Sequence, residues 1–178
     1  MCGIVGYLGN KKAYNILING LRRLEYRGYD SSGIMLYNGE LSVKKTKGKV
    51  SDLEVLYKNE NDKRGNIGLG HTRWATHGSP NKINSHPHLS NSGELCIIHN
   101  GIIENYDALR TVLKRKGYDF KSDTDSEVLV NFIEEIKKIK KVKLGKAVRL
   151  ALKEVIGAYA IAVFDKSNPS EIVTAKLG

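Results

Sequence analysis

The chain opens on the stretch MCGIVGYL, which covers residues 1–8. From Cys2 to Leu8 this is a short apolar run punctuated by glycines, which predicts a buried strand beginning almost at the first residue. Directly afterwards, from Ala13 to Leu24, apolar residues recur at spacings of three and one, which predicts one face of an amphipathic helix. The fold therefore begins with a strand followed at once by a helix.

Further strands are predicted in hairpin-like pairs. Residues 34–37 and 41–45 flank Asn38-Gly39, the strongest short signal for a β-hairpin. Other short apolar runs predict strands at 67–72, 95–99, 158–164 and 171–175. We expect the strand at 95–99 to end in Asn100-Gly101. The segment 73–88 is rich in His, Asn, Ser and Pro, and we expect it to be irregular.

Helices are predicted in groups between these strands. A short helix is expected over 50–57, and another starts near Asn105. The next begins at Thr124, where Glu127 completes a capping-box pattern, and the last covers 144–155. Hairpins and groups of helices are not the regular alternation of a parallel α/β protein, so the pattern predicts an α+β fold with antiparallel sheets.

Composition places the chain among ordinary globular proteins. Its 178 residues are 40% hydrophobic and 27% charged, which fits one domain over residues 1–178. Because the last predicted strand runs to within three residues of the C-terminus, we expect this domain to be cut from a longer protein. No run approaches about 18 apolar residues, so no membrane association is expected. The start lacks the basic and apolar regions of a secretory signal. Cys2 and Cys96 are the only cysteines, which favours a reducing, cytoplasmic setting.

The net charge of +10, from 29 Lys and Arg against 19 Asp and Glu, suggests nucleic acid as one partner to consider. The basic runs at 114–116 and 137–141 fall where helices are expected to end, and cations are favourable there. The run at 44–49 is expected to be solvated surface. Because the sequence has no RNA-binding aromatic motif, zinc-finger spacing or basic heptad, we expect no nucleic-acid partner.

Cys2 is a candidate nucleophile because of its position. If Met1 is removed, the free α-amino group of Cys2, with a pKa of about 7.7–8.0, can accept the proton of its own thiol. Cysteine is also among the most often buried residues, so a small core position at the start of the first strand is the alternative. Position alone does not decide between the two roles.

Asn100-Gly101 also has two interpretations. The pair can form a hairpin turn, or its amide and N–H groups can stabilise the oxyanion of a tetrahedral intermediate. Arg73 can bind a carboxylate through paired N–H groups, and Asp125 at a helix start can accept from an ammonium group. Together the two charges would suit a zwitterionic amino acid, although each also has a surface or capping explanation.

Five histidines lie between residues 71 and 99, a clustering that makes a metal site the first hypothesis. They are His71, His77, His86, His88 and His99. They form no HExxH motif and have no carboxylate at ligand spacing. We therefore expect them to hydrogen-bond within an ordered loop, and we expect neither a metal nor a cofactor.

Five motifs, read in chain order, resemble one family. They are MCGIVG at 1–6, LEYRGYDSSG at 24–33, HTRWATHG at 71–78, HNGIIEN at 99–105 and TDSE at 124–127. They are similar to the N-terminal glutaminase domain of the glutamine–fructose-6-phosphate aminotransferases, or glucosamine-6-phosphate synthases. These are class II, Ntn-type glutamine amidotransferases. The residues at 26–30 and 71–78 favour this aminosugar family, and the purine-pathway amidotransferase is the nearest competitor.

The resemblance implies a four-layer αββα sandwich that hydrolyses L-glutamine to L-glutamate and ammonia. Cys2 would be the nucleophile, with its freed amine as the base. Asn100 and Gly101 would form the oxyanion hole. Arg73 would hold the α-carboxylate of glutamine, and Asp125 its α-ammonium group.

Further residues are implied in supporting roles. The loop that closes over glutamine would contain Trp74, Thr76 and His77. Arg27 would steady the Cys2 end, Tyr29 would face the route taken by ammonia, and His86 would support the loop. The full-length enzyme would be a homodimer. Its isomerase domain, in the same full-length chain, would use the ammonia to convert fructose 6-phosphate to glucosamine 6-phosphate.

Two other functions stay open. A thiol hydrolase of the same fold would act on a different amide, and a screen of glutamine against other amides separates it from a glutaminase. A basic module that binds nucleic acid would show salt-dependent binding to a duplex or a single strand.

Overall fold

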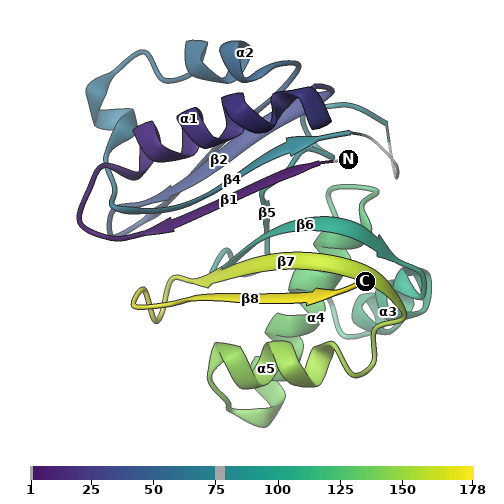
Figure 1. Cartoon of the computed structure of the whole chain (residues 1–178). Coiled ribbons are helices and arrows are strands. Elements are labelled where there is room, and N and C mark those ends of the chain that lie inside the picture. The colour runs from purple at the N-terminus through teal and green to yellow at the C-terminus, as the bar shows by residue number, and fades with distance from the viewer. Residues whose placement is uncertain (1, 75–78) are drawn as a thin grey trace.

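The computed structural model describes residues 2–74 and 79–178 and has four layers (Figure 1). Two four-stranded antiparallel sheets face each other. The first contains, in spatial order, β1 (Gly3–Leu8), β4 (Ile67–Arg73), β2 (Ser31–Tyr37) and β3 (Leu41–Lys47). The second contains β5 (His88–Leu89), β6 (Leu95–Ile103), β7 (Gly157–Asp165) and β8 (Ile172–Leu177).

Helices form the two outer layers. The first sheet is covered by α1 (Ala13–Leu24) and α2 (Val50–Val55). The second sheet is covered by α4 (Asp125–Lys140) and α5 (Leu144–Ala151), and α3 (Tyr106–Arg115) packs against α4. Short 3₁₀ turns are η1 (Glu25–Arg27) and η2 (Glu60–Lys63). The predicted αββα sandwich with antiparallel sheets is confirmed.

Three apolar clusters hold the four layers together. One lies between α1 and the first sheet and includes Leu17, Leu21 and Ile34. The middle cluster, between the sheets, contains Met35, Ile67, Leu69, Cys96, Ile98, Ala162 and Phe164. The third lies between the second sheet and its helices. Each sheet is therefore buried on both faces.

Glycines let α1 approach the first sheet closely. A Cβ on Gly68 would lie 2.6 Å from Leu17 Cδ1, and one on Gly70 would lie 3.2 Å from Leu21 Cδ1. Because side chains alternate along a strand, these glycines face α1 while Leu69 faces the second sheet. The same alternation turns His71 toward the second sheet.

Most of the predicted elements are present, with local differences. The strand predicted to end at Asn100 continues to Ile103. The hairpin loop has three residues, 38–40, because Tyr37 pairs with Leu41. At the start of α4, the Thr124 side chain accepts from the Glu127 N–H at 3.3 Å. The Glu127 carboxylate bonds instead to the backbone of Lys121 and Ser122, so the capping box is only half formed.

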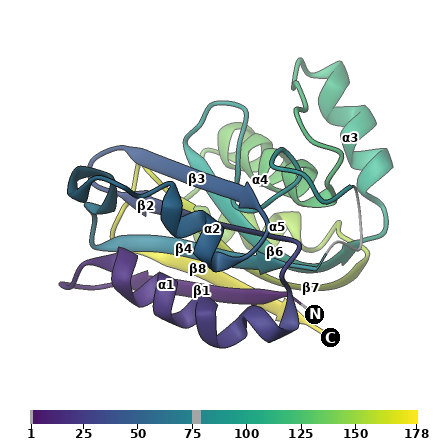
Figure 2. The same cartoon turned by 90° about the horizontal axis from the view of Figure 1, so that it is seen from above.

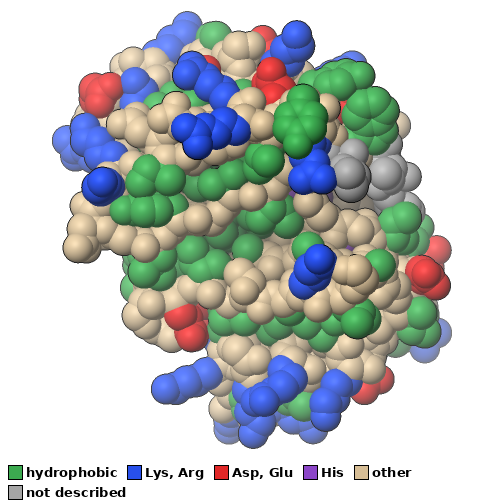
Figure 3. Space-filling model, viewed as in Figure 1, with side chains coloured by type: hydrophobic (Ala, Val, Ile, Leu, Met, Phe, Trp, Pro, Cys, Tyr) green, Lys and Arg blue, Asp and Glu red, His purple; other side chains and the backbone are tan. Residues whose placement is uncertain are grey.

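Basic side chains lie in the last turns of two helices, as expected. The last turn of α3 contains Lys114 and Arg115, and that of α4 contains Lys137, Lys138 and Lys140. On the face shown in Figure 3, Lys and Arg side chains lie in several separate places. Within residues 2–74 and 79–178, no helix combines the length and apolar character needed to cross a bilayer.

The N-terminal end of β1 and the C-terminal end of β8 lie at the same end of the sandwich, one in each sheet (Figures 1 and 2). This end is where the candidate site lies, because Cys2 precedes β1 and residues 176–178 line the same pocket.

Candidate active site

A pocket of about 540 Å³ lies where the two sheets meet at this end, and Cys2 lines it. The Trp74 N–H donates to Cys2 Sγ at 3.1 Å, and the thiol lies 3.5 Å from the Trp74 carbonyl oxygen. The Asn100 side-chain amide donates from Nδ2 to the Cys2 carbonyl oxygen at 2.9 Å. Cys2 is therefore held by the end of β4 on one side and by β6 on the other.

The pleat of β6 explains which of its side chains reach Cys2. Cys96 and Ile98 belong to the cluster between the sheets, so Asn100 lies on the same face of the strand. His99 faces the opposite way and bonds to Ser126 at the start of α4. The two cysteines thus have different surroundings: burial raises the pKa of the Cys96 thiol, whereas Cys2 is partly exposed in the pocket.

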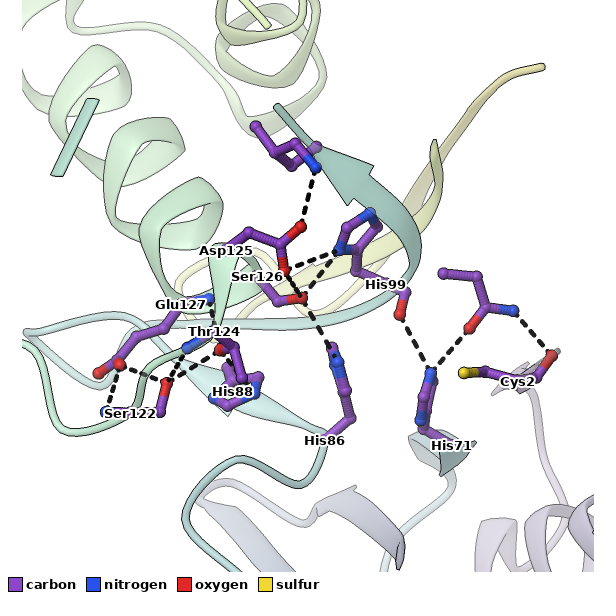
Figure 4. Close-up of polar contacts among 12 residues, drawn as sticks. Cys2, His71, His86, His88, His99, Ser122, Thr124, Asp125, Ser126 and Glu127 are labelled. Carbon is purple, nitrogen blue, oxygen red and sulfur yellow. Dashed lines mark hydrogen bonds and ion pairs between the residues drawn. The ribbon is translucent and has the colours of Figure 1, made fainter. Parts of the chain in front are cut away.

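Figure 4 shows His71 beside Cys2. Its Nε2 lies 2.8 Å from Asn100 Oδ1 and 3.1 Å from the His99 carbonyl oxygen. Burial lowers the pKa of His71 to about 4, so the ring is neutral at physiological pH. A neutral imidazole therefore contacts the oxygen of the Asn100 amide, whereas the amide nitrogen contacts Cys2.

Gly101 occupies a position that only glycine tolerates. Its φ is +125°, and a Cβ there would lie 2.1 Å from the Ala158 carbonyl oxygen on β7. The hairpin-turn interpretation of Asn100-Gly101 is wrong, because both residues lie within β6. Both also line the pocket that contains Cys2.

Arg73 and Asp125 bring opposite charges to the pocket, as the sequence predicts. Both side chains are buried and line its wall. Burial lowers the pKa of Arg73, and the nearby Cys2 and Asp125 act in the opposite direction. Asp125 is the first residue of α4, where a carboxylate is favourable. Its Oδ2 accepts from the Ile103 N–H at 2.8 Å.

The other expected site residues divide into three groups. Trp74, Arg27 and His86 line the pocket. Tyr29 lies next to the pocket, with its ring edge-on to Trp74 at a centroid distance of 5.2 Å. Thr76 and His77 lie outside the described residues.

The histidines do not sit in one loop, which corrects that expectation. His71, His88 and His99 lie on β4, β5 and β6, and only His86 of the described histidines is in irregular structure. All four are buried, and desolvation lowers each pKa. The His86 ring lies 4.2 Å from the His71 ring and 4.7 Å from the His88 ring. In the described part of the chain, no His, Cys, Asp or Glu group is arranged for a metal ion.

Lys45 is a residue whose position sequence reasoning missed. Its Nζ donates to three backbone carbonyls in the segment before β5, those of Ile83, Ser85 and Pro87, at 3.2, 2.7 and 3.2 Å. Burial lowers its pKa to about 8, so this side chain is not the solvated surface charge expected for residues 44–49. A run of lysines in the sequence does not indicate which lysine side chain is buried.

His99 and Ser126 were also not expected to line the pocket. They lie against Asp125, with His99 Nδ1 2.8 Å from Ser126 Oγ and 3.9 Å from Asp125 Oδ1 (Figure 4). The HNGIIEN and TDSE motifs contain both residues, but the contact between the motifs depends on how α4 packs on β6.

Nearly the whole chain is similar to known proteins. It is 60% identical, over 99% of its length, to the glutamine–fructose-6-phosphate aminotransferase [isomerizing] of Bacteroides thetaiotaomicron, and it spans 29% of that relative. A solved structure described as the allosteric regulatory enzyme of purine biosynthesis matches 98% of this chain and 37% of its own, with a TM-score of 0.83 and 28% identity.

The glutamine phosphoribosylpyrophosphate amidotransferase of B. subtilis, complexed with ADP and GMP, matches 93% of this chain and 35% of its own. Its TM-score is 0.78, also at 28% identity. The identity is thus far higher to the aminosugar relative than to the purine-pathway structures, as the motifs indicated. Residues 43–176 match the family described as "Glutamine amidotransferase domain". A family match over most of the chain, on the expected sandwich, shows that this protein belongs to the glutamine amidotransferase domain family.

Proposed function

We propose that residues 1–178 form one glutaminase domain, which hydrolyses L-glutamine to L-glutamate and ammonia. The observation that carries this proposal is that the Cys2 thiol shares a pocket with the opposite charges of Arg73 and Asp125. A guanidinium and a carboxylate in one buried site match the α-carboxylate and α-ammonium groups of a free amino acid. An amino acid held there would present its side-chain amide to the thiol.

In the proposed reaction, the Cys2 sulfur attacks the side-chain amide carbon of glutamine. The Asn100 amide and the Gly101 N–H stabilise the oxyanion of the tetrahedral intermediate. The α-amino group of Cys2, freed by removal of Met1, takes the thiol proton and gives it to the leaving ammonia. Water then cleaves the γ-glutamyl thioester, which releases glutamate and restores the thiol.

The other site residues have proposed supporting roles. Trp74, Thr76 and His77 would belong to the loop that closes over glutamine, which keeps bulk water from the thioester. Arg27 would steady Cys2, and His86 would support the loop through its ring contact with His71. Tyr29 would face the route of ammonia, a role supported by its contact with Trp74.

For the whole protein, we propose the activity that the Bacteroides relative's name states. Ammonia would pass to an isomerase domain in the same full-length chain and convert fructose 6-phosphate to glucosamine 6-phosphate. Family resemblance supports a homodimer. The two free cysteines support a cytoplasmic location.

The matched pair Cys2→Ala and Cys96→Ala tests the domain's function. The mature chain is incubated with glutamine, and glutamate and ammonia are measured. It is also treated with an electrophilic glutamine analogue and its intact mass recorded. We expect Cys2→Ala to lose activity and labelling. We expect Cys96→Ala to keep both, because Cys96 is buried in the core.

A screen of other amides completes this test. Hydrolysis of a different amide in preference to glutamine would identify the thiol hydrolase alternative instead. Labelling of Cys96, or equal activity in both variants, would contradict the assignment of Cys2.

A further inference from the structure

We propose that His71 is a positioning residue that fixes the orientation of the Asn100 side-chain amide. The inference rests on the proposed function, in which that amide donates to the oxyanion. Asn100 touches the reacting atoms in that mechanism, whereas His71 acts only through Asn100.

Two backbone carbonyls determine every donor and acceptor in this contact. The His99 carbonyl oxygen, 3.1 Å from His71 Nε2, can only accept, so Nε2 must carry the ring hydrogen. The Asn100 atom 2.8 Å from that Nε2 must then be the acceptor, Oδ1. The His71 tautomer and the Asn100 orientation are therefore set together.

The other end of the amide gives the same answer. Asn100 Nδ2 lies 2.9 Å from the Cys2 carbonyl oxygen, which also can only accept. A flipped amide would place two N–H donors face to face at His71 and two oxygens face to face at Cys2. Of the two hydrogens on Nδ2, one is used by Cys2, which leaves the second for an acceptor in the pocket.

The ring of His71 is itself held firmly. It is 1% exposed, lies on β4 between Ile4 and Gly33, and has the His86 ring 4.2 Å away. Its Nδ1 has no hydrogen-bond partner within residues 2–74 and 79–178. The contacts of Nε2 alone therefore select the tautomer. A rigid donor in this place removes the freedom of Asn100 to turn its oxygen toward the pocket.

Two variants of His71 separate positioning from packing. In His71→Gln, the side-chain N–H can reach the place of Nε2, whereas in His71→Asn it is too short to reach Asn100. We expect His71→Asn to lower kcat about 10- to 100-fold, with KM within about threefold of wild type, because a misoriented donor loses much of its effect. We expect His71→Gln to recover most of kcat.

His88→Gln is the matched control. His88 is equally buried, but its Nε2 bonds to Thr124 rather than to Asn100. We expect its kcat to stay near that of wild type. An equal fall in kcat for His71→Asn, His71→Gln and His88→Gln would show a general packing effect and overturn the proposal, as would an unchanged kcat in His71→Asn.

A second readout does not depend on glutamine. In ¹⁵N-labelled protein, we expect the His71 ring to show the Nε2–H tautomer. We also expect the Asn100 side-chain amide signals to be retained in His71→Gln and to shift and exchange faster in His71→Asn. If the wild-type domain hydrolyses no glutamine, the proposed function fails, and these signals still decide the role of His71. The Nδ1–H tautomer, or Asn100 signals unchanged in His71→Asn, would overturn it.

Discussion

The Asn100 amide nitrogen lies 2.9 Å from the carbonyl oxygen of Cys2, across a sequence separation of 98 residues. Cys2 precedes β1 in the first sheet and Asn100 lies on β6 in the second, so this hydrogen bond joins the two sheets at the pocket. It places an amide donor beside the thiol before any substrate is bound.

Asn100→Ala should therefore impair the transition state more than substrate binding. We expect kcat to fall by about two to three orders of magnitude with little change in KM, because one oxyanion donor is lost. Steady-state kinetics with glutamine measures this. Asn131→Ala is the control, since Asn131 is a buried asparagine on α4 whose amide bonds to the backbone of Glu127 and Asn91 rather than to Cys2. A kcat near wild type in Asn100→Ala would remove Asn100 from the oxyanion hole.

Arg73→Ala should raise KM. A charge-assisted contact to the α-carboxylate is worth about 1.5–3 kcal/mol, which corresponds to a rise of about 10- to 150-fold. Arg73→Lys should restore little of this, because an ammonium group lacks the paired N–H geometry of a guanidinium. Arg22→Ala, which breaks the surface pair with Glu54, controls for loss of a positive charge. Unchanged KM in both Arg73 variants would show that another group binds the carboxylate.

Local sequence patterns predicted much of this fold. Periodicity gave α1 with its observed bounds, and the Asn38-Gly39 signal gave the first hairpin. At Asn100-Gly101 the same turn signal was misleading. There the glycine is needed inside a strand, because its φ is positive and an added Cβ would collide with the Ala158 carbonyl oxygen. A dipeptide cannot show which of these two uses applies.

The contacts between residues of the site could not be predicted from local sequence patterns. Cys2, Arg73, Asn100 and Asp125 were found as single residues because each stands in a recognisable motif. The contact of His71 with Asn100 depends on the register of two strands in different sheets. The burial of Lys45 depends on the segment before β5, whose backbone carbonyls accept from its Nζ. Neither leaves a periodic signal in the chain.

The buried histidines should make the fold sensitive to acid. Burial lowers the pKa of His71 to about 4 and that of His88 well below 6.5. Between pH 6.5 and pH 4 the unfolded chain therefore binds more protons than the folded one, so stability falls as the pH falls. For His71 alone, a pKa shift from 6.5 to about 4 corresponds to a loss of about 3 kcal/mol by pH 4, and His88 adds to this loss in the same direction.

Urea unfolding at pH 7.5, 5.5 and 4.5 measures this loss. His88→Gln removes one of the titrating groups, so its stability should decline less steeply with acid than that of wild type. Carboxylates contribute equally to both proteins and cancel in the difference. Identical slopes would mean that His88 already takes up its proton in the folded state.

The reaction should require removal of Met1. While Met1 is attached, the nitrogen of Cys2 is a peptide amide and has no basic lone pair to accept the thiol proton. No side-chain base takes its place, because the hydrogen bonds of Cys2 Sγ within the described residues go to the backbone N–H and carbonyl of Trp74. The free α-amino group, with an ordinary pKa of about 7.7–8.0, supplies that base at neutral pH.

Intact-mass analysis separates the two forms. A preparation that retains Met1 should react slowly with an electrophilic glutamine analogue at about pH 7.5 and hydrolyse little glutamine, because the thiol lacks its base. Trimming with a methionine aminopeptidase should restore both reactions, and the label should map to Cys2. The second thiol, Cys96, serves as the internal control, since it is fully buried in the core. Equal labelling and equal glutaminase activity before and after trimming would rule out the α-amino group as the base. A group outside Cys2 would then have to be the base that accepts the proton of the Cys2 thiol.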